Sequence, residues 1–133
     1  MTMPITIDTS AYSAFEREHQ DIRQLLERAD EVWLSAIVLG ELHSGFLGGS
    51  RLQFNRSRLA AFLSRPGVHV GVLDQTTSER YAEILQHLRS AGSPLPTNDI
   101  WIAAHAMQHG LQVVTLDKHF SQMPQVSLLM FEK

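Results

Sequence analysis

The sequence predicts an α/β fold with three layers (α/β/α), in which a mostly parallel sheet of about five strands lies between helices. Short apolar runs alternate with helical segments from one end of the chain to the other. The segments between the runs are long enough to hold crossover helices, which is typical of parallel strands. The chain has 133 residues and contains no linker or repeat, so we expect one domain spanning residues 1–133.

Five short apolar runs are predicted to form the strands. They lie at residues 4–8, 32–35, 68–73, 111–117 and 126–131. The first and fourth runs each end in an acid, Asp8 and Asp117. Because ligands bind at the carboxyl ends of the strands in open parallel sheets, both acids occupy positions where a site is expected.

Six helices are predicted between and beside these strands. The first begins near residue 11, and the others span residues 20–29, 36–46, 51–64, 76–91 and 99–109. Thr9 and Ser10 are expected to cap the first helix and Ser35 the third, because short hydroxyl side chains accept hydrogen bonds from the free amides of a helix start. Gly110 is expected to end the last helix.

The composition leads us to expect a cytoplasmic protein with no membrane partner. The chain has no cysteine, so it has neither disulfides nor thiolate metal sites and suits a reducing compartment. We find no signal peptide at its start. No stretch approaches the roughly 18 apolar residues that a membrane span needs.

Positive charge is concentrated in one part of a chain whose net charge is −3. Residues 42–73 contain no Asp or Glu but contain Arg51, Arg56, Arg58 and Arg65. Such a local excess of arginine could bind phosphate groups, or it could form a solvated helix face. The pattern alone leaves both interpretations open. Arg51, Arg56 and Arg58 are therefore candidate contacts for a nucleic acid.

Four acids lie in or beside segments that otherwise look buried. Asp8 and Asp117 end strands, Glu41 lies in the apolar run I-V-L-G-E-L, and Asp99 opens the last predicted helix. Each has a structural explanation, because aspartate often caps helices and turns. Glu41 is the hardest to explain in this way, since an unpaired charge is expensive to bury.

Together the four acids indicate a metal site, provided that the fold brings them to one edge of the sheet. Carboxylates that lie close together repel one another and raise one another's pKa. Mg²⁺ relieves this repulsion, prefers oxygen ligands and needs only a few carboxylates. Such a site can activate water and stabilise charge on a phosphoryl group during in-line displacement.

The segments that carry these acids resemble a known family in their order and spacing. They are I-D-T-S, S-A-I-V-L-G-E-L-H-S-G, T-N-D-I-W-I-A-A-H-A and V-V-T-L-D-K-H-F. This set is similar to the PIN domain, and more narrowly to the VapC ribonuclease toxins of bacterial type II toxin–antitoxin systems. The resemblance covers nearly the whole chain, including its last short strand.

The resemblance implies a PIN-like fold with an acidic site that binds Mg²⁺, or Mn²⁺ in its place. The residues implied as catalytic and metal-binding are Asp8, Glu41, Asp99 and Asp117. The position of Asp117 is the most variable of the four in the family. Thr115 and Asn98 match positions that support the acids.

The resemblance also implies an activity and partners. The reaction would be metal-dependent endonucleolytic hydrolysis of an RNA phosphodiester by water, with no protein nucleophile. The RNA would be a transfer RNA or a ribosomal RNA. The implied protein partners are a small cognate antitoxin, whose arginine can pair with the acids, and a second copy of the chain in a homodimer.

Other interpretations remain beside this one. The same fold could serve as a catalytically silent module that holds RNA or an antitoxin, although the presence of all four acids argues against a decayed site. His105 and His109 are spaced i, i+4 as in a zinc motif, but the glutamate of that motif and a third ligand are missing. His119 could approach a substrate or be an ordinary exposed histidine. Trp33 and Trp101 are expected in the core.

Overall fold

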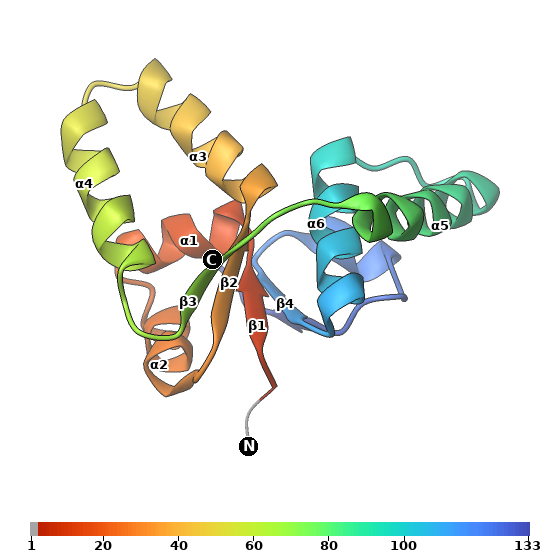
Figure 1. The fold of residues 1–133 in the computed structure, drawn as a ribbon, viewed down its shortest axis with the longest axis horizontal. Coiled ribbons are helices and arrows are strands. Elements are labelled where there is room, and N and C mark those ends of the chain that lie inside the picture. Colours follow the sequence, from red (N-terminus) through yellow and green to blue (C-terminus); the bar gives the residue numbers. More distant parts are fainter. Residues whose placement is uncertain (1–2) are drawn as a thin grey trace.

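The computed structural model describes residues 3–133, and its centre is a parallel sheet (Figure 1). The strands are β1 (Ile5–Ile7), β2 (Val32–Ser35), β3 (Val68–Gly71), β4 (Gln112–Thr115) and β5 (Leu128–Met130). Their order is β3-β2-β1-β4-β5, and all four pairings are parallel. The predicted α/β class with a parallel central sheet is confirmed, although four of the strands are shorter than the runs that predicted them.

Six helices surround this sheet in the described part of the chain. They are α1 (Thr9–Glu16), α2 (Gln20–Arg28), α3 (Ala36–Gly48), α4 (Leu52–Leu63), α5 (Gln75–Ala91) and α6 (Thr97–His109). Figure 1 shows α1, α2 and α4 on one side of the sheet and α5 and α6 on the other, which gives the three layers. A short 3-10 helix, Lys118–Gln122, follows β4. None of the helices in residues 3–133 is long and apolar enough to cross a membrane.

The strand order reverses beside β1. Strand β2 pairs with one edge of β1, and β4, later in the chain, pairs with the other edge of β1. Ile7 of β1 lies in register with Val114 of β4, so these two strands end close together. Residues that follow β1 and β4 therefore meet at the carboxyl edge of the sheet, where open α/β sheets bind ligands.

The interior is apolar on both faces of the sheet. Ile7, Leu34 and Val113 are completely buried. Helix α6 has six buried residues, more than any other helix of residues 3–133, and Ala103 and Ala104 are among those that are completely buried. This packing holds the residues at the start of α6 in fixed positions.

The two tryptophans lie at the margin of the core rather than inside it. Trp33 is partly buried and stacks on His109 with 5.7 Å between the ring centroids. Trp101 is also partly buried and stacks on Tyr81 at 4.0 Å. The prediction that both lie in the core is therefore met only in part.

The cap of α1 differs from the prediction. The helix begins at Thr9, and Asp8 caps it by accepting a hydrogen bond from the backbone N of Ala11 at 2.9 Å. Thr9 and Ser10 both lie inside the helix, so their predicted capping roles are wrong. Ser35 does cap α3, as predicted, by accepting from a backbone amide of the first turn.

The start of α6 also differs from the prediction. The helix begins at Thr97, two residues before Asp99, and Pro96 occupies the cap position without a side-chain hydrogen bond. Proline lacks an N–H and fixes φ, so it fits the position before a helix, but it supplies no side-chain acceptor for the free amides of the first turn. Gly110 ends the helix in the left-handed conformation at φ 66, as predicted.

Candidate functional site

Asp8 is the most buried of the four predicted acids, with 4% of its surface exposed. It follows β1 directly, at the point where the strand order reverses. Its Oδ1 accepts hydrogen bonds from Ser10 Oγ at 2.7 Å and from the backbone N of Ala11, and its Oδ2 accepts one from Thr115 Oγ1. Burial raises the pKa of Asp8 above its usual value, although these hydrogen bonds act in the opposite direction.

Two hydroxyl groups connect Asp8 to the end of β4. Thr115 Oγ1 accepts a hydrogen bond from the backbone N of Asp117 at 2.9 Å, and Ser10 Oγ accepts one from the backbone N of Leu116 at 3.0 Å. The structure thus places Thr115, a predicted supporting residue, between two of the acids. Ser10 holds the same two strands together, a role that the sequence analysis did not assign to it.

Asp99 and Asp117 approach each other from α6 and from the end of β4. Asp99 lies in the first turn of α6, and Asp117 caps the 3-10 helix by accepting a hydrogen bond from the backbone N of His119 at 2.9 Å. Burial raises the pKa of Asp99, and the negative charges of Asp117 and Glu41 raise it further, while His119 acts in the opposite direction. These carboxylates are therefore close enough to repel one another.

Glu41 projects from α3 and is only partly buried. Its Oε1 accepts a hydrogen bond from Thr9 Oγ1 at 2.7 Å, and its Oε2 accepts one from Asn98 Nδ2 at 3.4 Å. The Glu41 carboxylate, whose burial would be costly, thus stays in contact with solvent and accepts two hydrogen bonds. Asn98, a predicted supporting residue, is one of these two donors.

The fold brings all four acids to one edge of the sheet, but not all four within reach of a single ion. Among residues 3–133, one group of three side chains has ligand atoms that all lie within 4.8 Å of one another. It comprises Asp99, Asp117 and His119. Asp8 joins this group through Thr115 and through the charge of Asp117, and Glu41 joins it through the charge that it exerts on Asp99.

His119 is the residue of this site that the sequence analysis undervalued. Its ring Nδ1 lies 3.2 Å from Asp99 Oδ2 and 3.3 Å from Asp117 Oδ1. The 3-10 helix after Asp117 turns the ring back toward α6. The contact with Asp99 spans 20 positions of the chain, so no local pattern could have revealed it.

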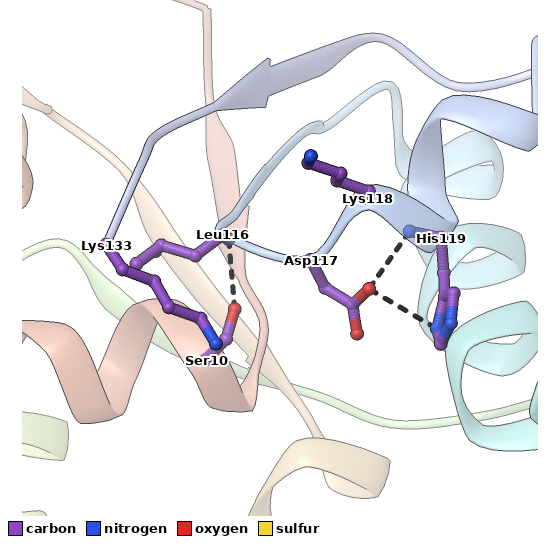
Figure 2. Close-up of a pocket in the computed structure, with 6 residues that line it drawn as sticks. All are labelled: Ser10, Leu116, Asp117, Lys118, His119 and Lys133. Carbon is purple, nitrogen blue, oxygen red and sulfur yellow. Dashed lines mark hydrogen bonds and ion pairs between the residues drawn. The ribbon is translucent and has the colours of Figure 1, made fainter.

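Two hollows border the acids. A pocket of about 410 Å³ is lined by Ser10, Leu116, Asp117, Lys118, His119 and Lys133. Figure 2 shows Asp117 and His119 facing each other across part of it, with Lys118 and Lys133 on its margin. A second hollow of about 460 Å³ borders Glu41 and Asn98.

The candidate arginine contacts lie at and on α4, outside the acidic group. Arg58 Nε lies 3.0 Å from Glu16 Oε2, and the guanidinium of Arg51 lies 3.9 Å from the centre of the Phe54 ring. Arg56 is exposed. The structure therefore pairs Arg58 with Glu16 rather than with any of the four acids.

The histidines of α6 form no metal group with a third ligand among the described residues. His105 is completely buried, and both of its ring nitrogens lack a hydrogen-bond partner in residues 3–133. Burial lowers its pKa to about 4, and the neighbouring His109 adds to that effect. The arrangement supports packing rather than a zinc motif.

Comparisons with known proteins agree with this geometry. Residues 5–126 match the PIN domain family. Ribonuclease VapC4 and Ribonuclease VapC5 of Mycobacterium tuberculosis are 32% and 30% identical to the chain. The first match covers 92% of both proteins, and the second covers 86% of this chain and 84% of the relative.

Solved structures repeat the fold over nearly the whole chain. VapBC2 from Rickettsia felis, bound to a DNA fragment from its promoter, has a chain that is 25% identical with a TM-score of 0.88, covering 98% of this chain and 100% of that one. A chain of VapBC-5 from Mycobacterium tuberculosis is 26% identical with a TM-score of 0.74 and the same coverage. This chain belongs to the PIN domain family, and within that family to the VapC-type ribonuclease toxins.

Proposed function

We propose that this protein is a magnesium-dependent endoribonuclease that acts as the toxin of a type II toxin–antitoxin pair, with Mn²⁺ as an alternative cation. The observation that carries the proposal is the gathering of Asp8, Glu41, Asp99 and Asp117 at one edge of the sheet, beside the reversal of strand order. The relatives named ribonucleases support the RNA substrate.

The donor set fits a hard divalent cation. Burial and mutual repulsion raise the pKa of Asp8 and of Asp99, so the negative charge of each carboxylate is unfavourable without a positive charge nearby. Carboxylate oxygens are the ligands that Mg²⁺ prefers, and it keeps several waters when it binds to proteins. A divalent cation therefore offsets the repulsion that the fold creates.

Hydrogen bonding restricts which oxygen of Asp8 can bind such a cation. Each carboxylate oxygen has about two lone pairs. Oδ1 already accepts from Ser10 and Ala11, whereas Oδ2 accepts only from Thr115. Oδ2 is therefore the Asp8 oxygen with a lone pair left for the cation or for one of the waters that the cation retains.

The residues of the site also limit the type of reaction. Ser10 Oγ donates to Asp8 and accepts from the backbone N of Leu116, so both hydrogen bonds hold this hydroxyl in a structural position and it is not free to act as a nucleophile. The bound cation would supply Lewis acidity that activates water and stabilises negative charge on the phosphoryl group. Glu41, partly exposed and held by Thr9 and Asn98, can orient water at the same edge of the sheet.

Two lysines are the positive side chains that line the pocket beside Asp117. Lys118 and Lys133 form no ion pair with a carboxylate of residues 3–133. We assign them contacts with the RNA phosphates next to the cleaved bond. Arg51, Arg56 and Arg58 would contact RNA farther from that bond, and Arg58 would first have to leave Glu16.

We propose a small antitoxin as the protein partner. The similar solved structures include VapBC2 and VapBC-5, and VapBC-5 is described as a member of the VapBC family of toxin–antitoxin systems. An arginine from an antitoxin would inhibit the enzyme by pairing with the acids, since charge-assisted hydrogen bonds to carboxylates are strong. We also propose that the toxin forms a homodimer. A mass measured in solution that is twice that of the chain would support it.

The test is cleavage of total cellular RNA by antitoxin-free protein, with Mg²⁺ and with excess chelator. We expect discrete fragments from wild-type protein with Mg²⁺, and none from Asp8→Asn or in chelator. Asp21→Asn, an exposed change at the start of α2, is the matched control and should cleave normally. Equal cleavage by wild type and Asp8→Asn would refute the assignment. No cleavage by folded protein would favour a silent binding module.

A further inference from the structure

We propose that His119 is a protein ligand of the cation beside Asp99 and Asp117, and that this nitrogen makes the site bind Mn²⁺ more tightly than Mg²⁺. The inference rests on the metal site of the proposed function and specifies its ligands and its preferred metal. It begins from the group of Asp99, Asp117 and His119, whose ligand atoms lie within 4.8 Å of one another. This group is a mixed set of two carboxylates and one imidazole.

Two of the three separations within this group match those of neighbouring ligands around one ion. An octahedral ion with bonds of about 2.1 Å places neighbouring ligand atoms about 3.0 Å apart. Nδ1 of His119 lies 3.2 Å from Asp99 Oδ2 and 3.3 Å from Asp117 Oδ1. The ring nitrogen thus already stands at the distance of a neighbouring ligand from both oxygens, and small shifts suffice to bind an ion between them.

The backbone holds the ring in this position. The backbone N of His119 donates to Asp117 Oδ1 at 2.9 Å, which ties the residue to one of its fellow ligands. The next residue, Phe120, is 1% exposed and anchors the 3-10 helix in the core. Figure 2 shows the His119 ring beside the Asp117 carboxylate at the wall of the pocket. The group is therefore accessible to ions from solvent, and the buried Phe120 holds the 3-10 helix that carries it in place.

A nitrogen ligand changes the order of metal affinities. Mg²⁺ is bound almost entirely by oxygen atoms and loses its waters reluctantly. Mn²⁺ also accepts carboxylate ligands, but as a first-row transition ion it binds to mixed N/O sites, so replacing one oxygen by Nδ1 weakens Mn²⁺ binding less than Mg²⁺ binding. An alternative role for His119 is a hydrogen-bond bridge between the carboxylates, in which Nδ1 carries a proton and never contacts the metal. The experiment below distinguishes the two roles.

The experiment is pulsed electron paramagnetic resonance of Mn²⁺ bound to the purified protein, combined with titration of Mn²⁺ and of Mg²⁺. We expect ¹⁴N modulation from a coordinated imidazole in wild type, replaced by a ¹⁵N signal after histidine labelling. His119→Ala should lose the nitrogen signal and bind Mn²⁺ about ten-fold more weakly, with a smaller loss for Mg²⁺. His87→Ala, an exposed change on α5, is the matched control and should retain both properties.

The possible results separate this inference from the proposed function. Mn²⁺ binding without nitrogen modulation, or an unchanged affinity in folded His119→Ala, would overturn the ligand role of His119. The proposed function would still stand in that case if RNA cleavage requires metal and Asp8. Failure of wild-type protein to bind either cation would overturn both. Circular dichroism and thermal unfolding of each variant confirm that the compared proteins are folded.

Discussion

Thr115 connects two of the four acids through a single hydroxyl group. Its Oγ1 donates to Asp8 Oδ2 and accepts from the backbone N of Asp117. A hydroxyl can do both at once, because it has one donor and two acceptor sites. Since both bonds meet at one atom, the orientation of the Asp8 carboxylate and the position of the chain at Asp117 depend on each other.

Thr115→Val should lower kcat for RNA cleavage about ten- to hundred-fold, with a smaller effect on KM. Valine keeps the shape of threonine but removes the donor to Asp8 Oδ2 and the acceptor for the Asp117 amide. Thr115→Ser keeps the hydroxyl and is the matched control, which should retain most of the activity. The measurement is steady-state cleavage of one RNA fragment that the wild type cuts. An unchanged kcat in the valine variant would mean that the hydroxyl does not position Asp8.

Asp99→Asn should stabilise the metal-free protein while abolishing cleavage. The Asp99 side chain is 15% exposed, and its raised pKa means that its negative charge is unfavourable in the folded state at neutral pH. Asparagine removes that charge and keeps an acceptor for His119. We expect Tm in chelator to rise by about 3 °C.

The matched control for this prediction is Asp21→Asn, whose side chain lies outside the site and which should lower Tm slightly, because it removes an acid from the first turn of α2. Addition of divalent cation should raise the Tm of the wild type and of this control, because a ligand that binds only the folded state stabilises it. The same addition should have little effect on Asp99→Asn. A lower Tm of Asp99→Asn in chelator would contradict the unfavourable charge.

At the scale of elements, the contact between β3 and α6 depends on a glycine. Gly71 ends β3, and a Cβ atom at this position would clash with the ring of His105 from α6. The backbone at Gly71 has no positive φ, so the reason for glycine here is space rather than conformation. His105 in turn is completely buried in this contact.

Gly71→Ala should destabilise the protein by about 1 to 3 kcal/mol, because overpacking forces a buried ring out of its place. Combination with His105→Ala should relieve part of this loss, so the double variant should be more stable than the sum of the single effects predicts. Chemical denaturation of the four proteins in this cycle measures the coupling. The matched control is Gly40→Ala, which places a methyl group in open space inside α3 and should not destabilise the protein. Gly92→Ala is unsuitable as a control, because the backbone there has φ 67.

The sequence predicted the positions of the acids on their elements, and local physics explains why. Asp8 and Asp117 follow apolar strands, and parallel strands end at a common edge, so their meeting followed from the fold class. The start of α6 was misplaced by two residues because Pro96 begins the helix without a side-chain cap. Asp99 therefore lies in the first turn, where its negative charge interacts favourably with the helix dipole.

What the sequence could not provide were contacts between distant segments. The role of Ser10 depends on the backbone of Leu116, and that of His119 depends on Asp99. Both residues have side chains that are common in exposed turns and helix starts, so local patterns favoured the ordinary interpretation. Only the register of β1 against β4 and the turn of the 3-10 helix give these side chains their partners.

At the scale of the whole molecule, the fold gathers negative charge at one edge and buries an unpaired histidine elsewhere. The raised pKa of Asp8 and of Asp99 means that their ionisation costs stability at neutral pH, and this cost disappears as pH falls toward 3.8. His105 behaves in the opposite way, because its pKa is lowered from 6.5 to about 4. The unfolded chain takes up its proton first, so stability falls as pH falls through that window.

His105→Leu should separate these opposing effects. Leucine is apolar and leaves no ring nitrogen unpaired in the core, so at pH 7 the variant should be about as stable as the wild type or slightly more so. Its relative stability should then grow by about 3 kcal/mol between pH 7 and pH 4, because only the wild type must keep a buried imidazole neutral. The contributions of Asp8 and Asp99 cancel in this comparison, since both proteins retain them. Urea denaturation in chelator at the two pH values measures the change, and a difference that stays constant would mean that His105 titrates alike in the folded and unfolded chains.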